Sequence, residues 1–334
     1  MLFSLLTALF ACVIVVITGE FLLRVFSPQT SMYPRWKFSP EYGYVLYGNT
    51  TMVHERPGRW RFTYTTNEYQ YRGKSIPISN RYDKPNIVIL GDSYSFGAGV
   101  NDGDEYAAIM NEELEEHFNV VNLGVGGWGL AQEIRRYYEF GQLYSPRVVV
   151  LQFATNDPTD NFNNRVTTVE DGKFRFRNSN STINWLKKYL SHSIIQNSQL
   201  YNLFRDTLYR YFKANIIERE KLTFGEAYSG ESPPEETFYN DLLEMFADDL
   251  NKKGVSLLMI AVNGQLDRFP YIKEKVNNLD RRGVLQYYEV KEWFKDITNY
   301  GSPEGHAWGK KAHHIVGAKL AQIIKRNHTS MNEK

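Results

Sequence analysis

The residues best placed to do chemistry in this sequence follow a short apolar run. Ile87 to Leu90 predicts a buried strand, and Gly91-Asp92-Ser93 comes directly after it, before a glycine-rich turn. In open α/β sheets, ligands bind outside the carboxyl ends of the strands, so a hydroxyl group there meets substrate and not the core. Ser93 is therefore a candidate nucleophile, and an ordinary turn serine is the alternative.

A run of glycines follows the next apolar stretch, Val120 to Leu123. The spacing of Gly124, Gly126 and Gly129 fits the pattern G-x-G-x-x-G of dinucleotide-binding sites. That match is weak, because this strand is not the first of the predicted sheet and the next strand ends near Asn156, where a ribose-binding acid should be. The other interpretation is that glycine lets a main-chain N–H approach an oxyanion closely.

Apolar runs and helical patterns alternate along most of the chain after residue 85. Strands are expected at about 87–90, 120–123, 148–153, 255–262 and 284–288. Helices are expected at about 105–117, 130–143, 236–252, 271–280 and 309–325. The alternation predicts a parallel sheet whose strands all end in small or polar residues along one edge, where a site would form.

Two segments fall outside this alternation. Residues 27–85 are rich in Tyr, Arg, Thr, Asn and Pro, and the alternating stretch at 59–66 predicts a hairpin. We expect this segment to form a juxtamembrane collar against the main domain. Within residues 158–234, the part at 160–181 is polar and turn-rich, whereas 185–212 repeats apolar residues at helical spacing. We expect an inserted helical cap, which could simply pack on the domain, cover the site, face the membrane or bind a partner.

The first segment has the composition of a membrane span. Met1 to Thr18 carries no charged side chain and is dense in Leu, Val and Ile. A cleavable signal peptide is the main alternative, although no basic n-region or small-residue cleavage site is evident. A lipoprotein processing site at Cys12 is a weaker alternative, because more apolar residues follow that cysteine. Arg24, Arg35 and Lys37 follow the span and no basic residue precedes it, which favours a cytoplasmic C-terminal side.

Composition excludes several classes of protein. The chain has 39 Lys and Arg against 38 Asp and Glu, so its formal charge of +1 gives no broad electrostatic argument for nucleic acid. Cys12 is the only cysteine, which excludes disulfides, a catalytic cysteine and a Cys-based zinc site from the globular part. The aromatic share of 15% fits sugar or peptide contacts as well as ordinary packing. We expect no cofactor and no metal, and the oligomeric state stays open.

The chain resembles the SGNH (GDSL-type) hydrolase family, strongly over residues 86–156 and loosely over residues 257–324. The family's sequence blocks are matched, in the family's order, by Gly91-Asp92-Ser93, Asn122 to Gly127, Thr155-Asn156-Asp157 and His306. The resemblance implies a three-layer α/β/α fold with a flavodoxin-like parallel sheet. We expect that fold to be preceded by a transmembrane helix and interrupted by the helical insertion.

The same resemblance assigns roles to residues. It implies Ser93 as the nucleophile and His306 as the base, although a loop histidine before a C-terminal helix can also be idle. It implies an oxyanion hole made of the backbone N–H groups of Ser93 and Gly127 and the side-chain amide of Asn156. Serine is a poor nucleophile at its free pKa, so a neutral imidazole must take its proton as the oxygen attacks a carbonyl.

The last block departs from the family's commonest pattern, in which an aspartate lies three residues before the histidine and a proline follows it. Those positions are Pro303 and Ala307 here. Family members that act on exported polysaccharides can have the acid two residues before the histidine, so the resemblance implies Glu304 as the triad acid. His313 and His314 are alternative bases, which we expect to face solvent or to pack locally on the last helix.

We therefore expect three parts: an anchor at 1–26, a collar at 27–85 and an SGNH-like hydrolase domain at 86–334, with its cap insertion at about 158–234. The expected function is that of a serine esterase that removes a small acyl group, acetyl for example, from an envelope glycan or lipid through a Ser93 acyl-enzyme. An O-acetyltransferase acting on an exported polysaccharide and a non-catalytic binding module with the same fold are the alternatives. We expect a catalytic domain outside the cytoplasm, in the periplasm or at the cell surface, although the basic residues after the span argue against this orientation.

Overall fold

The predicted α/β alternation forms a five-stranded parallel sheet in the computed structural model, which describes residues 1–80, 83–179, 184–208, 210–211 and 232–332. The strands are β6 (Asn86–Leu90), β7 (Asn119–Asn122), β8 (Pro146–Phe153), β11 (Ser256–Ala261) and β12 (Gln286–Glu289). Their order is β12-β11-β8-β6-β7, and every neighbouring pair is parallel. This is the flavodoxin-like order, in which the strand order reverses between β6 and β8 and leaves a crevice at the carboxyl ends of these two strands.

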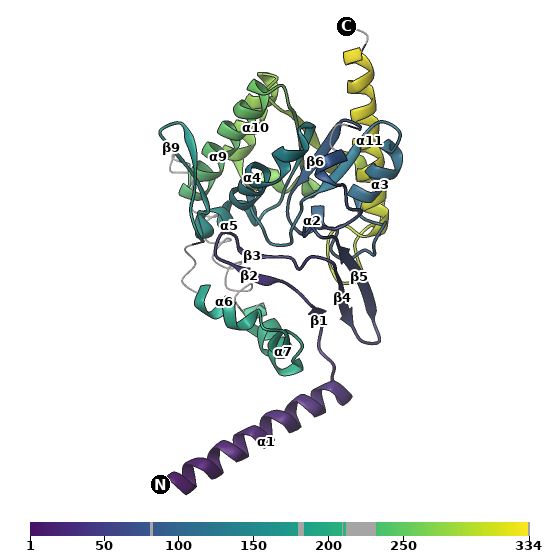
Figure 1. The fold of residues 1–334 in the computed structure, drawn as a ribbon. Helices are drawn as coiled ribbons and strands as arrows, with labels where there is room; N and C mark the ends of the chain where they lie inside the picture. The colour runs from purple at the N-terminus through teal and green to yellow at the C-terminus, as the bar shows by residue number, and fades with distance from the viewer. Residues whose placement is uncertain (81–82, 180–183, 209, 212–231, 333–334) are drawn as a thin grey trace.

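Helices cover both faces of the sheet (Figure 1). They are α3 (Tyr106–Leu114), α4 (Leu130–Glu139), α9 (Pro234–Lys252), α10 (Pro270–Arg281) and α11 (Lys310–Asn332). Val88 and Leu90 of β6 lie in one core with α4, α9 and α10, whereas Ile87 and Ile89 lie in the other core with α3 and α11. Side chains along a strand alternate between its faces, so a strand covered on both sides is apolar throughout. The predicted three-layer α/β/α fold is confirmed.

The collar contains two small antiparallel sheets. The first pairs β1 (Ser31–Tyr33) with β4 (Thr50–Arg56) and β4 with β5 (Trp60–Thr66), and the second pairs β2 (Lys37–Ser39) with β3 (Gly43–Val45). Residues 59–66, predicted to form a hairpin, supply only its second strand, β5, because its first strand, β4, lies before the predicted range. Arg72, which follows these strands, is buried and donates to the carbonyls of Gly97 and Val100. The collar is thereby fixed to the loop that follows Ser93.

The cap differs from its prediction in its first part. The stretch expected to be polar and turn-rich contains α5 (Asp157–Asn164) and a hairpin of β9 (Thr167–Glu170) and β10 (Lys173–Phe176). Asp171 and Gly172 make the turn, with φ values of 50° and 68°. Alternation of Val169, Phe174 and Phe176 with polar residues is enough for a hairpin once such a turn joins the two segments.

The second part of the cap is helical, as predicted, but broken into pieces. These are α6 (Asn184–Leu190), α7 (Ser193–Gln196) and a helix at 199–208, while Phe212, at the end of the predicted range, lies outside the described residues. The last piece begins against the anchor, because Glu20 accepts from the backbone N–H groups of Gln199 and Leu200. The cap therefore lies beside the point where the chain leaves α1 (Leu2–Phe26), as Figure 1 shows.

Helix α1 is apolar up to Gly19 and carries two charged residues, Glu20 and Arg24, near its end; none of its residues is buried. The most apolar stretch of 18 residues in this helix has a mean hydropathy of 2.5, and none of its residues is buried. By length and composition the helix can cross a membrane, and a signal sequence would have the same properties.

Glu133 on α4 and Asp157 at the start of α5 carry two of the buried carboxyl groups of the described chain. Neither oxygen of Glu133 has a hydrogen-bond partner among the described residues, whereas Oδ2 of Asp157 accepts from the N–H of Ala154 at 3.0 Å. Burial raises the pKa of both groups well above the usual range; the charge of Asp92 adds to the effect on Glu133, and that of Glu133 to the effect on Asp157. Burial therefore favours the protonated form of both carboxyls.

We expect Glu133→Gln to raise the free energy of unfolding at pH 8 by about 1–2 kcal/mol. In the wild type the unfolded glutamate ionises near its ordinary pKa while the folded carboxyl stays protonated, so stability falls as the pH rises between the two pKa values. Glutamine removes that fall. Urea unfolding at pH 5 and pH 8 measures the change in the free energy of unfolding between these pH values. The exposed Glu112→Gln on α3 is the matched control. An unchanged pH dependence in Glu133→Gln would contradict the protonated state.

Candidate active site

Ser93 lies where β6 ends and the short helix α2 (Ser93–Phe96) begins. Asp92 caps this helix, because its carboxylate accepts from the N–H of Tyr94 at 2.9 Å. Gly91 has a φ of 154°, and a Cβ at this position would lie 2.2 Å from Oγ of Ser95. The sharp turn that presents Ser93 at the carboxyl edge of the sheet therefore needs glycine at this position.

His306 reaches Ser93 from the loop before α11. Its Nε2 lies 2.9 Å from Oγ of Ser93, although 213 residues separate the two in sequence. Ser302 holds this loop in place by donating to the carbonyl of Gly99 at 2.9 Å, and the ring of Tyr94 packs against His306 at a centroid distance of 4.0 Å. The structure thus brings together the predicted nucleophile and the predicted base.

The surroundings of His306 favour its neutral form. Burial lowers the pKa of the imidazole below its ordinary value, and Glu304 opposes this effect with its negative charge. A neutral imidazole can accept the Ser93 proton at Nε2, which leaves the N–H on Nδ1. That Nδ1 is buried and has no hydrogen-bond partner among the described residues.

Glu304 is paired with a residue that sequence reasoning missed. Its Oε2 lies 3.0 Å from Nδ1 of His54, which belongs to β4 of the collar. The predicted acid therefore lies near His306, close enough to raise its pKa, but its direct partner is His54. No local feature of the sequence links His54 to the last block, and the role of Glu304 as the triad acid stays a prediction.

The predicted oxyanion donors follow three neighbouring strands of the sheet: Ser93 comes after β6, Gly127 after β7 and Asn156 after β8. The backbone N–H groups of Ser93 and Gly127 make no hydrogen bond within the described part of the chain. Tyr44 of the collar donates to the carbonyl of Gly126 at 3.0 Å, and Gly127 adopts a φ of 78°. The side-chain amide of Asn156 donates to Asp160 at 2.9 Å. Their joint action on an oxyanion stays a prediction.

A cavity of about 910 Å³ opens over Ser93 and His306. Asn156 lines it together with residues of the collar, such as Thr30 and His54, and with Arg210 of the cap. The cavity is large enough for a sugar residue or a small acyl ester. The collar and the cap, which lie outside the α/β alternation, therefore supply part of its wall.

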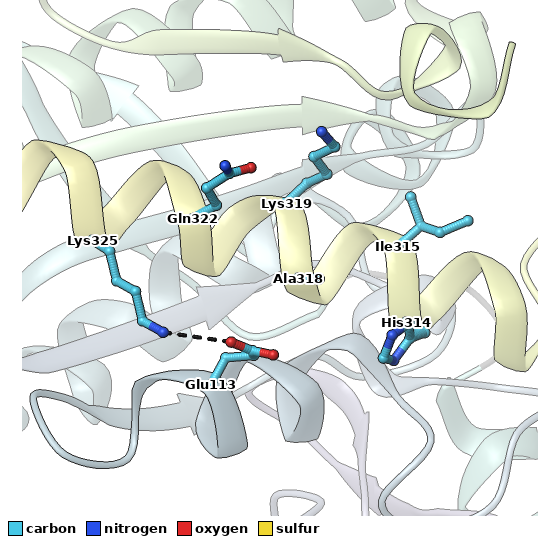
Figure 2. A pocket seen from close by; sticks show the side chains of 7 residues that line it. All are labelled: Glu113, His314, Ile315, Ala318, Lys319, Gln322 and Lys325. Carbon is cyan, nitrogen blue, oxygen red and sulfur yellow. Dashed lines mark hydrogen bonds and ion pairs between the residues drawn. The ribbon is translucent and has the colours of Figure 1, made fainter.

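The two alternative bases lie away from this cavity. His313 is buried, and its Nδ1 accepts from the N–H of Tyr106 at 3.2 Å. Figure 2 shows His314 on α11, beside a surface groove of about 490 Å³ where Lys325 pairs with Glu113 at 3.4 Å. One histidine thus packs locally and the other faces solvent, as the sequence predicts.

Comparison with known proteins gives one family and several similar folds. Residues 89–271 match the GDSL-like lipase/acylhydrolase family. A lipolytic protein of the G-D-S-L family from Desulfitobacterium hafniense DCB-2 is 11% identical, with a TM-score of 0.44 over 72% of this chain and 99% of its own. An acetylxylan esterase from Geobacillus stearothermophilus is 13% identical, with a TM-score of 0.40 over 71% of this chain and 93% of its own. No curated protein matches the chain in sequence.

Proposed function

Because this chain belongs to the GDSL-like lipase/acylhydrolase family, we propose that it is a serine esterase that removes a small acyl group, such as acetyl, from an envelope glycan or lipid. The observation that carries this proposal is the 2.9 Å contact between Oγ of Ser93 and Nε2 of His306 at the floor of an open cavity. A serine and a neutral imidazole in this geometry form an activated nucleophile.

The proposed reaction has two halves. In the first, Nε2 of His306 takes the proton of Ser93 as Oγ attacks the ester carbonyl, and the N–H groups of Ser93 and Gly127 with the amide of Asn156 donate to the tetrahedral oxyanion. Collapse of the intermediate breaks the bond to the alcohol, which leaves with the proton held by His306. In the second, His306 takes a proton from a water molecule as that water attacks the acyl-enzyme carbonyl. The second tetrahedral intermediate then collapses, His306 returns the proton to Oγ of Ser93, and the carboxylic acid is released.

A fluorophosphonate probe tests the proposal directly, since it modifies only an activated serine. We expect covalent labelling at Ser93, located by peptide mass spectrometry. A folded protein that stays unlabelled while a known serine esterase reacts would instead support a non-catalytic binding module. Product analysis with an acetylated glycan then separates two outcomes: free acetate indicates hydrolysis, and acetyl found on an added sugar indicates transfer.

We also propose that α1 anchors the chain and that the collar (27–85) and the hydrolase domain (86–334) lie outside the cytoplasm. Glu20 and Arg24, at the end of α1, contact the cap, which is the place expected for the membrane surface. Protease added to sealed, right-side-out vesicles that carry the full chain should digest the catalytic domain. Protection would place it on the cytoplasmic side, as the basic residues after the span favour.

We expect Glu304→Gln to move the acidic limb of the pH profile of kcat/KM to lower pH. Activity requires neutral His306, so it rises with pH through the pKa of that imidazole. The charge of Glu304 raises this pKa, and its removal lowers it. If Glu304 also orients the imidazole, the plateau of kcat/KM should fall about 10-fold or more.

The comparison variant is His54→Gln, which removes the other partner of the contact between Glu304 and His54. The charge of His54 lowers the pKa of His306, so this variant should shift the limb to higher pH. Hydrolysis of a soluble ester between pH 4 and pH 9 measures both shifts. If the acidic limbs of both variants coincided with that of the wild type, neither charge would act on the pKa of His306.

A further inference from the structure

Four arginines line the cavity above Ser93. Arg35, Arg56 and Arg59 come from the collar and Arg210 from the cap, so they reach the cavity from two separate parts of the chain. The whole chain carries a formal charge of only +1, with 39 basic and 38 acidic side chains. A cavity wall with four guanidinium groups is therefore a local feature and not a consequence of a basic chain.

The acidic groups of this cavity do not neutralise the arginines. Asp92 and Glu304 are the carboxylates that line it, among the described residues. Asp92 is buried and accepts from the N–H of Tyr94, and Glu304 pairs with His54 at 3.0 Å. Both carboxylates are thus engaged by groups other than the arginines.

None of the four arginines has an ion pair or a side-chain hydrogen bond within the part of the chain that the structure describes. In contrast, Arg61, which lies on the β4–β5 hairpin with Arg56 and Arg59, pairs with Glu55 at 3.2 Å. Arg35 is half-buried, and its pKa is lowered by burial and by the charge of Arg205. The charge of Asp206 opposes this effect, but Asp206 is paired with Arg205 at 2.7 Å. A half-buried cation without a salt bridge of its own costs free energy, which an anion bound beside it would recover.

We propose that the ester hydrolysed at Ser93 carries an anionic group, a phosphate or a carboxylate, which Arg35, Arg56, Arg59 and Arg210 bind in this cavity. Guanidinium groups donate in a planar fork that matches both anions. The inference rests on the proposed esterase function for its substrate, while anion binding itself can be measured without catalysis.

The kinetic test compares three acetyl esters of similar shape: 4-acetoxybenzoate, 4-acetoxyphenyl phosphate and the neutral methyl 4-acetoxybenzoate. Each kcat/KM is divided by the rate of the same ester with hydroxide, which removes intrinsic reactivity. We expect a preference of about 10- to 100-fold for an anionic ester at low salt, which falls as the salt concentration rises. The larger of the two anionic values identifies phosphate or carboxylate as the preferred group.

The double variant Arg56→Gln/Arg59→Gln should lose most of that preference, since both side chains line the cavity. Arg61→Gln is the matched control, because it lies on the same hairpin, is exposed and pairs with Glu55 outside the cavity. It should keep the preference. An equal or higher rate with the neutral ester, or a preference that survives the double variant, would overturn the inference and leave the esterase function intact.

Calorimetry on Ser93→Ala separates the two proposals if no ester is hydrolysed. Binding of 4-acetoxybenzoate or 4-acetoxyphenyl phosphate, but not of the methyl ester, with loss of that binding on adding Arg56→Gln/Arg59→Gln, would support the anion site even without catalysis. Absence of binding by either anion would overturn the inference.

Discussion

Replacing Ser93 by alanine is expected to abolish fluorophosphonate labelling and to lower kcat/KM for a soluble ester on the order of 10⁴-fold or more. The variant removes the only atom that bonds to the acyl group in the proposed reaction. The cavity, His306 and the proposed oxyanion donors stay in place, so ester binding should change little. The loss should therefore appear in kcat, and burst kinetics with a chromogenic acetyl ester measure it.

Ser95→Ala is the matched control for this result. Ser95 lies in the same short helix, but its Oγ is buried and lies 2.7 Å from the hydroxyl of Tyr106, away from His306. We expect this variant to lose some stability and to keep labelling at Ser93. Labelling that persists in Ser93→Ala would mean that another residue is the nucleophile.

The part of the fold that sequence predicts well depends on local patterns. Runs such as Ile87 to Leu90 are too short and too branched for a helix, and each is bounded by turn residues. Ser93 and Asn156 could be placed at one edge because each follows such a run, and parallel strands end at the same side of a sheet. The structure places the turn of Ser93 after β6 and Asn156 after β8, which are neighbouring strands.

The contacts between the collar and the site could not be predicted in the same way. His54 meets Glu304 only because β4 is folded against a loop 250 residues further along the chain. Arg56 and Arg59 have the pattern of ordinary exposed hairpin residues, and nothing local distinguishes them from Arg61. Such pairings depend on tertiary packing, which the hydrophobic periodicity of a sequence does not report.

The cap shows an intermediate case. Helical spacing predicts its helices correctly but not where they break. The helix at 199–208 starts after Ser198, whose Oγ accepts from the N–H of Tyr201, and Glu20 of the distant α1 accepts from the first two N–H groups of the helix. The hairpin of β9 and β10, in contrast, has a local signal that the sequence analysis did not use. Asp171-Gly172 between two alternating stretches is a common two-residue hairpin turn.

Replacing His306 by glutamine is expected to lower kcat/KM by a factor on the order of 10⁴ and to slow fluorophosphonate labelling strongly. Glutamine can hydrogen-bond to Ser93 but cannot take its proton, so the effect isolates proton transfer from loop packing. The acidic limb of the pH profile, which reports the lowered pKa of His306, should vanish as well.

His314→Gln provides the control, because it changes the same residue type on the exposed side of α11, beside the groove of Figure 2. It should leave rate and pH profile unchanged. If His306→Gln kept its acidic limb, the titrating base would be a different group, and the 2.9 Å contact with Ser93 would then serve to position the serine and not to deprotonate it. A limb lost only in His306→Gln assigns the base to the loop before α11.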